Sequence, residues 1–102
     1  MAKISLIAKL PCAEGKNDEF EAALAAMIEA SNEEAGLEIY SAHKAKDSND
    51  YYFFELYTDD EALAVHGKGD GMKAAMAAIG AHMAGRPEIT MMSPVVAKGM
   101  DL

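Results

Sequence analysis

The sequence predicts an α+β fold, a ferredoxin-like βαββ(αα)β sandwich in which helices cover one face of a four-stranded antiparallel sheet. Three observations predict it. Three segments, residues 3–10, 37–44 and 51–58, show the period of two that is typical of strands, and a fourth strand is predicted from Glu88 to Val96. Two stretches repeat apolar residues every three or four positions, as amphipathic helices do. Their order along the chain is β-α-β-β-α-β, and a glycine-rich stretch splits the second helical region.

The first predicted strand runs from Lys3 to Leu10 and alternates throughout. A connector leads to a helix that starts at Asn17 or Asp18, and Gly36 is typical of the residue that ends a helix. The residues at helical spacing predict the buried face of this helix: Phe20, Leu24, Met27, Ile28, Ser31 and Ala35.

Two strands joined by a short polar turn predict a hairpin in the middle of the chain. Leu37 to Lys44 alternates, residues 47–50 (DSND) form the turn, and an aromatic strand follows from Tyr51. One face of the aromatic strand carries Tyr51, Phe53, Glu55 and Tyr57.

The last third of the chain predicts a split helical region and a final strand. Asp59 or Asp60 caps a short helix that ends at His66, and residues 67–71 (GKGDG) form a connector. A second helix from Asp70 to Met83 buries the apolar residues that recur at helical spacing: Met72, Met76, Ile79 and Met83. The final strand, Glu88 to Val96, bends or leaves the sheet at Pro94 because proline donates no ladder hydrogen bond.

Length and charge limit the classes of function. A chain of 102 residues is expected to form a single domain, residues 1–102. Its net charge of −8 disfavours nucleic acid and anionic lipid as partners. No apolar run approaches the roughly 18 residues of a membrane span, and the N-terminus is typical of a strand rather than a signal peptide. One cysteine, Cys12, allows no disulfide framework, so we expect a cytoplasmic protein.

The junction between the aromatic strand and the short helix contains the best candidates for a site. It brings a carboxylate (Glu55), a phenol (Tyr57) and an imidazole (His66) close to aromatic surface, which suits a small, flat, apolar ligand. We predict these three as catalytic residues, and Tyr40, His43 and Asn32 as substrate-binding residues.

Each candidate also has a structural interpretation. His66 can be the partner of a helix C-terminus, and Glu55 can pair with Lys44 or Arg86. The tyrosines can be core residues, Asn32 an exposed amide, and His43 a cross-strand polar contact. The three histidines lie far apart in the sequence, so we predict no metal site and no cofactor.

The order and spacing of four segments resemble the antibiotic biosynthesis monooxygenase (ABM) domain family. The resemblance runs from Ile4 to about Val96. The segments are GKNDEFEAAL (15–24), EAGLEIY (34–40), FFELYTDDEALAVH (53–66) and MAGRPEIT (83–90).

The resemblance implies a homodimer, a dimeric α/β barrel in which two sheets pack together and each subunit keeps a pocket between its sheet and helices. Members include quinol and polyketide monooxygenases without metal or flavin, haem-degrading enzymes, and an isomerase of a phosphorylated autoinducer. This chain has Tyr57 where the monooxygenase and haem-degrading branches commonly carry Trp, and it has residues 69–71 (GDG) in place of a second histidine. The first strand lacks the polar Asn of the haem-degrading branch, which disfavours haem degradation. Tyr57 and the residues that follow it are more similar to the sequence of the isomerase branch at this position.

The first hypothesis is therefore a cofactor-independent monooxygenase acting on a small quinol- or phenol-like substrate, with dioxygen as co-substrate. An ionised substrate of this kind reacts with oxygen itself, so the protein needs to desolvate it, accept its proton and stabilise the anion. His66 or Glu55 would accept the proton, and Tyr57 and Tyr40 would bind the oxyanion. The alternatives are an isomerase of a small phosphorylated hydroxyketone and a non-catalytic dimeric ligand-binding domain.

Overall fold

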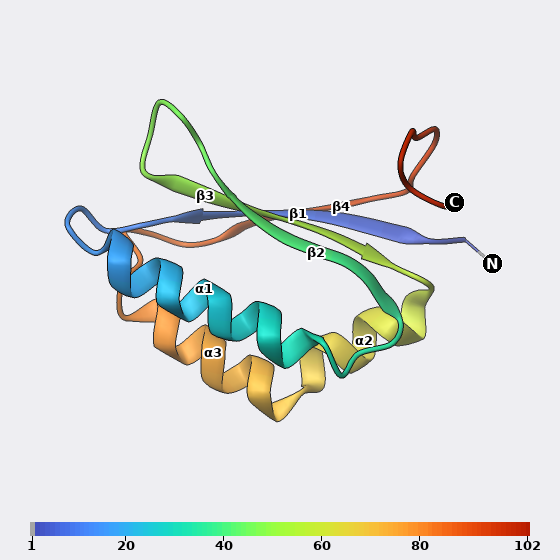
Figure 1. Cartoon of the computed structure of the whole chain (residues 1–102), viewed down its shortest axis with the longest axis horizontal. Coiled ribbons are helices and arrows are strands. Elements are labelled where there is room, and N and C mark those ends of the chain that lie inside the picture. The colour runs from blue at the N-terminus through green and yellow to red at the C-terminus, as the bar shows by residue number, and fades with distance from the viewer. Residues whose placement is uncertain (1) are drawn as a thin grey trace.

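A computed structural model describes residues 2–102, with only the backbone at positions 68 and 70–72. Four strands and three helices form two layers, with the helices on one side of the sheet (Figure 1). In chain order they are β1 (Ile4–Pro11), α1 (Asn17–Ser31), β2 (Leu37–Lys44), β3 (Asp50–Tyr57), α2 (Asp60–Lys68), α3 (Asp70–Gly80) and β4 (Glu88–Met92). The predicted α+β class and the split second helical region are confirmed.

The sheet has the order β2-β3-β1-β4, and all neighbouring strands are antiparallel. The predicted hairpin is present, with Tyr40 opposite Glu55. On its other side β3 pairs with β1, where Leu6 lies opposite Glu55. Directly opposed residues share a face of the sheet, so the register places Tyr40, Glu55 and Leu6 in one row on the face toward the helices.

The core lies between this inner face and the helices. It contains Leu6, Ala8 and Leu10 of β1, Tyr51 and Phe53 of β3, Phe20, Leu24 and Met27 of α1, and Ala75 and Ile79 of α3. The predicted buried face of the first helix is thus largely confirmed. The predicted cap of the short helix is also present, because the Asp59 carboxylate accepts a hydrogen bond from the backbone N–H of Ala62 at 2.9 Å.

Three element boundaries differ from the prediction by three residues or more, and α2 also continues to Lys68 beyond its predicted end at His66. Helix α1 ends at Ser31, five residues before Gly36, and the backbone then turns through hydrogen bonds such as Glu34 N–H to the Ser31 carbonyl. Helix α3 ends at Gly80, because the following segment pairs with the end of β1 through a bridge between Cys12 and Met83. Strand β4 ends at Met92, two residues before Pro94, as the missing proline N–H requires.

The predicted methionine face of the last helix is only partly present. Ile79 is fully buried, but Met76 is 41% exposed and Met83 lies beyond the helix. Met72 lies outside the described side chains. In the structure α3 packs mainly against α1.

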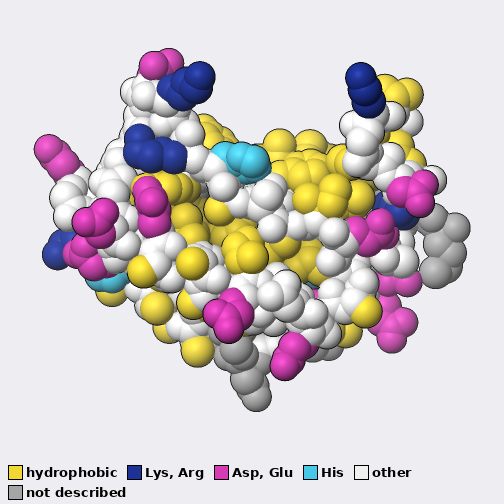
Figure 2. Space-filling model, in the orientation of Figure 1, with side chains coloured by type: hydrophobic (Ala, Val, Ile, Leu, Met, Phe, Trp, Pro, Cys, Tyr) yellow, Lys and Arg dark blue, Asp and Glu magenta, His cyan; other side chains and the backbone are white. Residues whose placement is uncertain are grey.

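The other face of the sheet carries an apolar surface. Ile7 is 38% exposed at its centre, and Phe54 lies directly opposite it on β3. Figure 2 shows hydrophobic side chains gathered in the hollow between the β2–β3 loop and the C-terminal segment. Within the described part of the chain, no helix is long and apolar enough to cross a membrane.

Candidate functional site

A cavity of about 300 Å³ lies between the inner face of the sheet and the helices. Strands β1 and β3 form its floor through Leu6, Ala8 and Phe53, and the helices contribute Leu63 and Met76. Apolar groups make up most of its wall. Its volume is at the lower end of the roughly 300–1,000 Å³ of small-molecule sites, so it suits one small ligand.

Two polar side chains of β3 enter the cavity side by side. Glu55 and Tyr57 are two residues apart and therefore share the inner face of the sheet. Both are buried, and the Tyr57 hydroxyl donates a hydrogen bond to Glu55 Oε1.

Helix α2 places His66 above this pair, and the imidazole lies between two carboxylates. Its Nδ1 is 2.9 Å from Glu34 Oε1 and 3.2 Å from Glu34 Oε2. Its Nε2 is 3.8 Å from Glu55 Oε1. The His66 and Glu34 side chains are only 12% and 16% exposed, so this contact is shielded from water.

Aromatic rings fix the imidazole and line one wall. Tyr40 stacks on Phe53 with 4.5 Å between ring centroids, and it meets the His66 ring edge-on at 5.2 Å. Tyr57 meets the same imidazole edge-on at 5.6 Å. Two aromatic rings thus pack against the His66 imidazole.

Burial shifts the ionisation of the polar groups. Desolvation raises the pKa of Glu55; the hydrogen bond from Tyr57 and the charge of His66 act in the opposite direction, and the charge of Glu34 acts with burial. Burial also raises the pKa of Tyr57, and its bond to Glu55 adds to this effect. The phenol therefore stays protonated, and the neutral acid form of Glu55 is favoured relative to a carboxyl in water.

The hydrogen bonds define what His66 can do. An ionised carboxylate only accepts hydrogen bonds, so Glu34 holds the proton of a neutral imidazole on Nδ1. The Nε2 lone pair is then directed toward Glu55 and the cavity. This arrangement, a base oriented by a third group, is typical of sites that abstract a proton.

The structure brings four of the six predicted site residues together. Glu55, Tyr57, His66 and Tyr40 all line the cavity. The polar partners of Glu55 are Tyr57 and His66 rather than Lys44 or Arg86.

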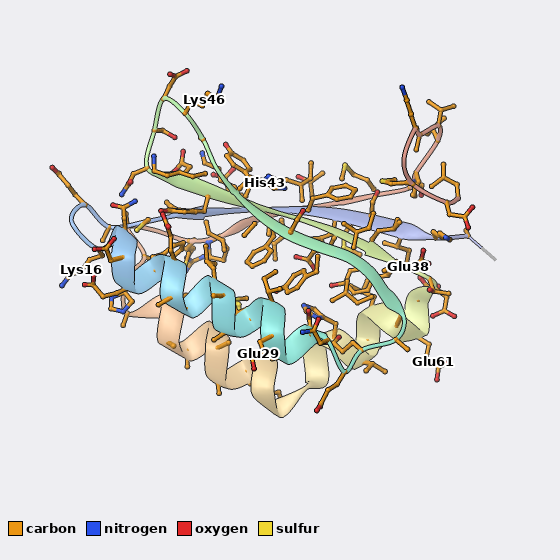
Figure 3. All side chains as sticks on the ribbon, viewed as in Figure 1. Lys16, Glu29, Glu38, His43, Lys46 and Glu61 are labelled. Carbon is orange, nitrogen blue, oxygen red and sulfur yellow. The ribbon has the colours of Figure 1, made fainter. Side chains whose placement is uncertain are left out.

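Asn32 and His43 lie elsewhere, which corrects their predicted place in the site. Asn32 is exposed at the C-terminal cap of α1, where its backbone N–H bonds the Glu29 carbonyl. His43 is exposed on the outer face of the sheet, 2.9 Å from the Ser41 hydroxyl (Figure 3). A strand alternates its faces, so His43 and Tyr40, three residues apart, point to opposite sides.

Sequence reasoning missed Glu34. The predicted helix continued through this position and gave its side chain no partner, whereas the helix actually ends at Ser31. Glu34 then lies in the turn before β2, from which its carboxylate reaches His66, 32 residues later in the sequence. Among the residues that the structure describes, no group of three or more His, Cys, Asp or Glu is arranged to hold a metal ion.

The raised pKa of Glu55 predicts a pH-dependent effect on stability. A carboxyl group whose pKa is higher in the folded state stabilises the fold fully below its unfolded pKa, and this contribution is lost as the pH rises through the folded pKa. The Glu55→Gln variant removes this titration. We expect its urea midpoint to exceed that of the wild type at pH 8 and to approach it at pH 4. A difference between the two proteins that does not change with pH would contradict this.

Comparison with known proteins places this chain in a family. The chain belongs to the antibiotic biosynthesis monooxygenase (ABM) family, whose sequence model matches residues 3–78. The fold and the predicted family resemblance are thereby confirmed. No protein in the curated set matches the chain.

Solved structures share the fold over nearly the whole chain. One from Caulobacter crescentus CB15, named provisionally as an antibiotic biosynthesis monooxygenase, is 33% identical with a TM-score of 0.89, and the match covers 93% of this chain and 92% of that one. PA3566 from Pseudomonas aeruginosa is 26% identical with a TM-score of 0.83 and coverages of 94% and 97%. Rv0793 from Mycobacterium tuberculosis, at 22% identity, has a TM-score of 0.86 and coverages of 94% and 98%, and supports the fold alone.

Proposed function

We propose that this protein is a cofactor-independent monooxygenase that acts on a small phenol- or quinol-like compound. One observation carries the proposal: His66 lies between Glu34 and Glu55 at the wall of an apolar cavity. A proton acceptor with an orienting partner in an apolar cavity is what the oxygenation of an ionisable ring requires.

The proposed reaction begins with the transfer of the ring hydroxyl proton to Nε2 of His66. The Nδ1 bond to Glu34 stabilises the imidazolium that forms. Glu55, in its neutral form, donates a hydrogen bond to the phenolate. The Tyr57 hydroxyl meanwhile donates a hydrogen bond to the other carboxyl oxygen of Glu55, Oε1. An electron-rich ring carbon of the phenolate then adds to dioxygen. The O–O bond then breaks, and one oxygen atom stays as a quinone carbonyl. The second oxygen leaves as water with the hydrogen of the attacked ring carbon and the hydroxyl proton that His66 returns.

The charges of the cavity favour this substrate over a phosphorylated hydroxyketone. Among the described side chains that line the cavity there is no Lys or Arg, and Glu55 lines it with Glu34 directly behind His66. A phosphate group needs cationic or N–H donors and is repelled by carboxylates. The isomerase alternative is therefore the weaker of the two enzymatic hypotheses.

Oxygen uptake measures the proposed activity directly. The wild-type protein is incubated with a panel of substituted quinols and phenols, and its rate is compared with buffer and with the His66→Ala/Tyr57→Phe variant. Uptake that depends on the wild-type protein supports the oxygenase. Equal rates in all three across the panel would overturn it, and a tight complex without turnover would favour the non-catalytic binding domain.

We also propose that two copies pack through the outer sheet face, as predicted from the sequence. The support is the apolar surface around Ile7 and Phe54, which monomers rarely expose as a continuous patch. We expect light scattering to give the mass of a dimer for the wild type and of a monomer for Ile7→Glu. Ala78→Glu, on the exposed side of α3, is the control and should remain dimeric. A wild-type monomer at micromolar concentration would contradict the proposal.

A further inference from the structure

We infer that the substrate carries an apolar substituent that leaves the cavity beneath β4 and lies on the side chains of Ile89 and Met91. The inference rests on the proposed function, because it describes the ligand of the same site. It adds a substrate class: ring compounds with an alkyl or similarly apolar chain.

The register of the sheet defines the path of this substituent. Leu6 of β1 lies opposite Glu55 of β3 on one side and opposite Met91 of β4 on the other. Ala8 likewise lies between Phe53 and Ile89. Opposed residues share a face, so two rows run across the strands from the polar groups of β3 to apolar side chains of β4.

Burial along these rows shows where the cavity opens. Phe53 is 2% exposed and Ala8 7%, but Ile89 at the end of the same row is 60% exposed. In the other row, Glu55 and Leu6 are 6% and 7% exposed, whereas Met91 is 53% exposed. The site is closed above β3 and β1 and opens at β4.

The opening is apolar on both sides. Ile89 of β4 and Met76 of α3 both line the cavity, and Met76 is 41% exposed. A ligand whose ring hydroxyl reaches His66 therefore has its remaining substituents directed toward an apolar exit. Two strand spacings, about 10 Å, separate β3 from β4, which leaves room for a chain beyond the ring.

The rows also favour the substrate over a protein segment as the occupant. Ile89 lines the cavity beside Ala8, and Met91 continues the row of Leu6 beyond the cavity lining, without a polar residue between the members of either pair. A chain attached to the bound ring would cover them without any further binding event. A peptide would have to bury its backbone N–H and C=O groups against side chains that offer no partners.

Calorimetric titration with 4-alkylphenols tests the inference without turnover. The probes are 4-methyl-, 4-propyl- and 4-hexylphenol, used under nitrogen. We expect Kd to fall by up to about fourfold for each methylene that becomes buried. An affinity for wild type that does not change with chain length would overturn the inference.

Two matched variants locate the contact. The ratio of the Kd of the methyl compound to that of the hexyl compound should be about tenfold or more smaller in Met91→Ser than in the wild type, because this variant removes apolar area at the end of the path. Val95→Ser removes an apolar side chain that is 84% exposed and lies outside the rows, so it should leave the ratio of the two Kd values as in the wild type. Equal chain-length dependence in Met91→Ser and the wild type would place the substituent elsewhere.

The titration separates this inference from the proposed function. Chain-dependent binding without oxygen uptake would reject the oxygenase and keep the alkyl-binding path. Oxygen uptake with simple phenols, together with chain-independent binding, would keep the oxygenase and reject the path.

Discussion

Replacing His66 by alanine is expected to lower protein-dependent oxygen uptake by about 10²- to 10⁴-fold, the usual contribution of a positioned general base. The variant removes the only imidazole that the described residues place in the cavity. It also removes the partner that faces Glu55 at 3.8 Å. The free energy of unfolding should change much less than the rate of oxygen uptake, because the imidazole lies at the cavity wall and not in the packed core.

The Glu34→Gln variant should reproduce part of this loss. Glutamine can still accept the hydrogen from Nδ1, but it carries no charge to stabilise the imidazolium. We expect kcat to fall by about 10- to 100-fold, the range found when the partner that orients a metal-bound histidine is removed, while KM changes little. Such a division between kcat and KM identifies a positioning residue, since a general loss of structure would change both.

Glu29→Gln is the matched control for Glu34. Glu29 is an exposed glutamate of α1 that precedes Glu34 in the sequence (Figure 3), whereas the carboxylate that bonds His66 Nδ1 is that of Glu34. It should retain wild-type oxygen uptake. If Glu29→Gln and Glu34→Gln lose activity equally, the contact between Glu34 and His66 has no role in the reaction.

The sequence was sufficient for the fold because the first three strands show their alternation clearly. Residues 37–44 were predicted as a strand with the bounds that the structure has, and the alternation of β3 placed Phe53, Glu55 and Tyr57 on one face. The same rule would have separated Tyr40 from His43, which are three residues apart in β2. The two were nevertheless predicted to bind one substrate, although the period of two places them on opposite faces of the sheet.

The contact that completes the site could not be predicted from local patterns. Glu34 meets His66 only because α1 ends at Ser31 and because α2 packs beside the start of β2. The end of α1 at Ser31 depends on residues 32–36, whose sequence indicates the end of a helix only weakly. The packing of α2 beside the start of β2 is a tertiary contact between residues 32 positions apart, which helical and strand periodicity do not encode.

Adding one methyl group at Gly36 is expected to disturb both stability and activity. A Cβ atom at this position would lie 2.4 Å from the Cβ of Ala62, and neither atom can rotate away. The Gly36 carbonyl also accepts a hydrogen bond from the Thr58 N–H at 2.8 Å, which ties the start of β2 to the end of β3. Overpacking of this kind costs about 1–3 kcal/mol, so Gly36→Ala should lower the urea midpoint clearly.

The same clash should reach the candidate site through α2. Ala62 and His66 are four residues apart and therefore lie on one face of that helix. Pushing Ala62 away from β2 would move His66 away from Glu34, which lies two residues before Gly36. We expect oxygen uptake to fall about tenfold or more in Gly36→Ala, since small displacements of a catalytic group have large effects on rate.

A second substitution tests whether the clash is the cause. Ala62→Gly removes the opposing methyl group, although glycine costs about 1 kcal/mol in a helix. The Gly36→Ala/Ala62→Gly variant should therefore be more stable and more active than Gly36→Ala alone, while Ala62→Gly alone destabilises. Gly80→Ala adds a methyl group where no atom lies within 4 Å, and should be neutral or stabilising. If the double variant is less stable than Gly36→Ala, close packing of β2 against α2 does not hold His66 in place.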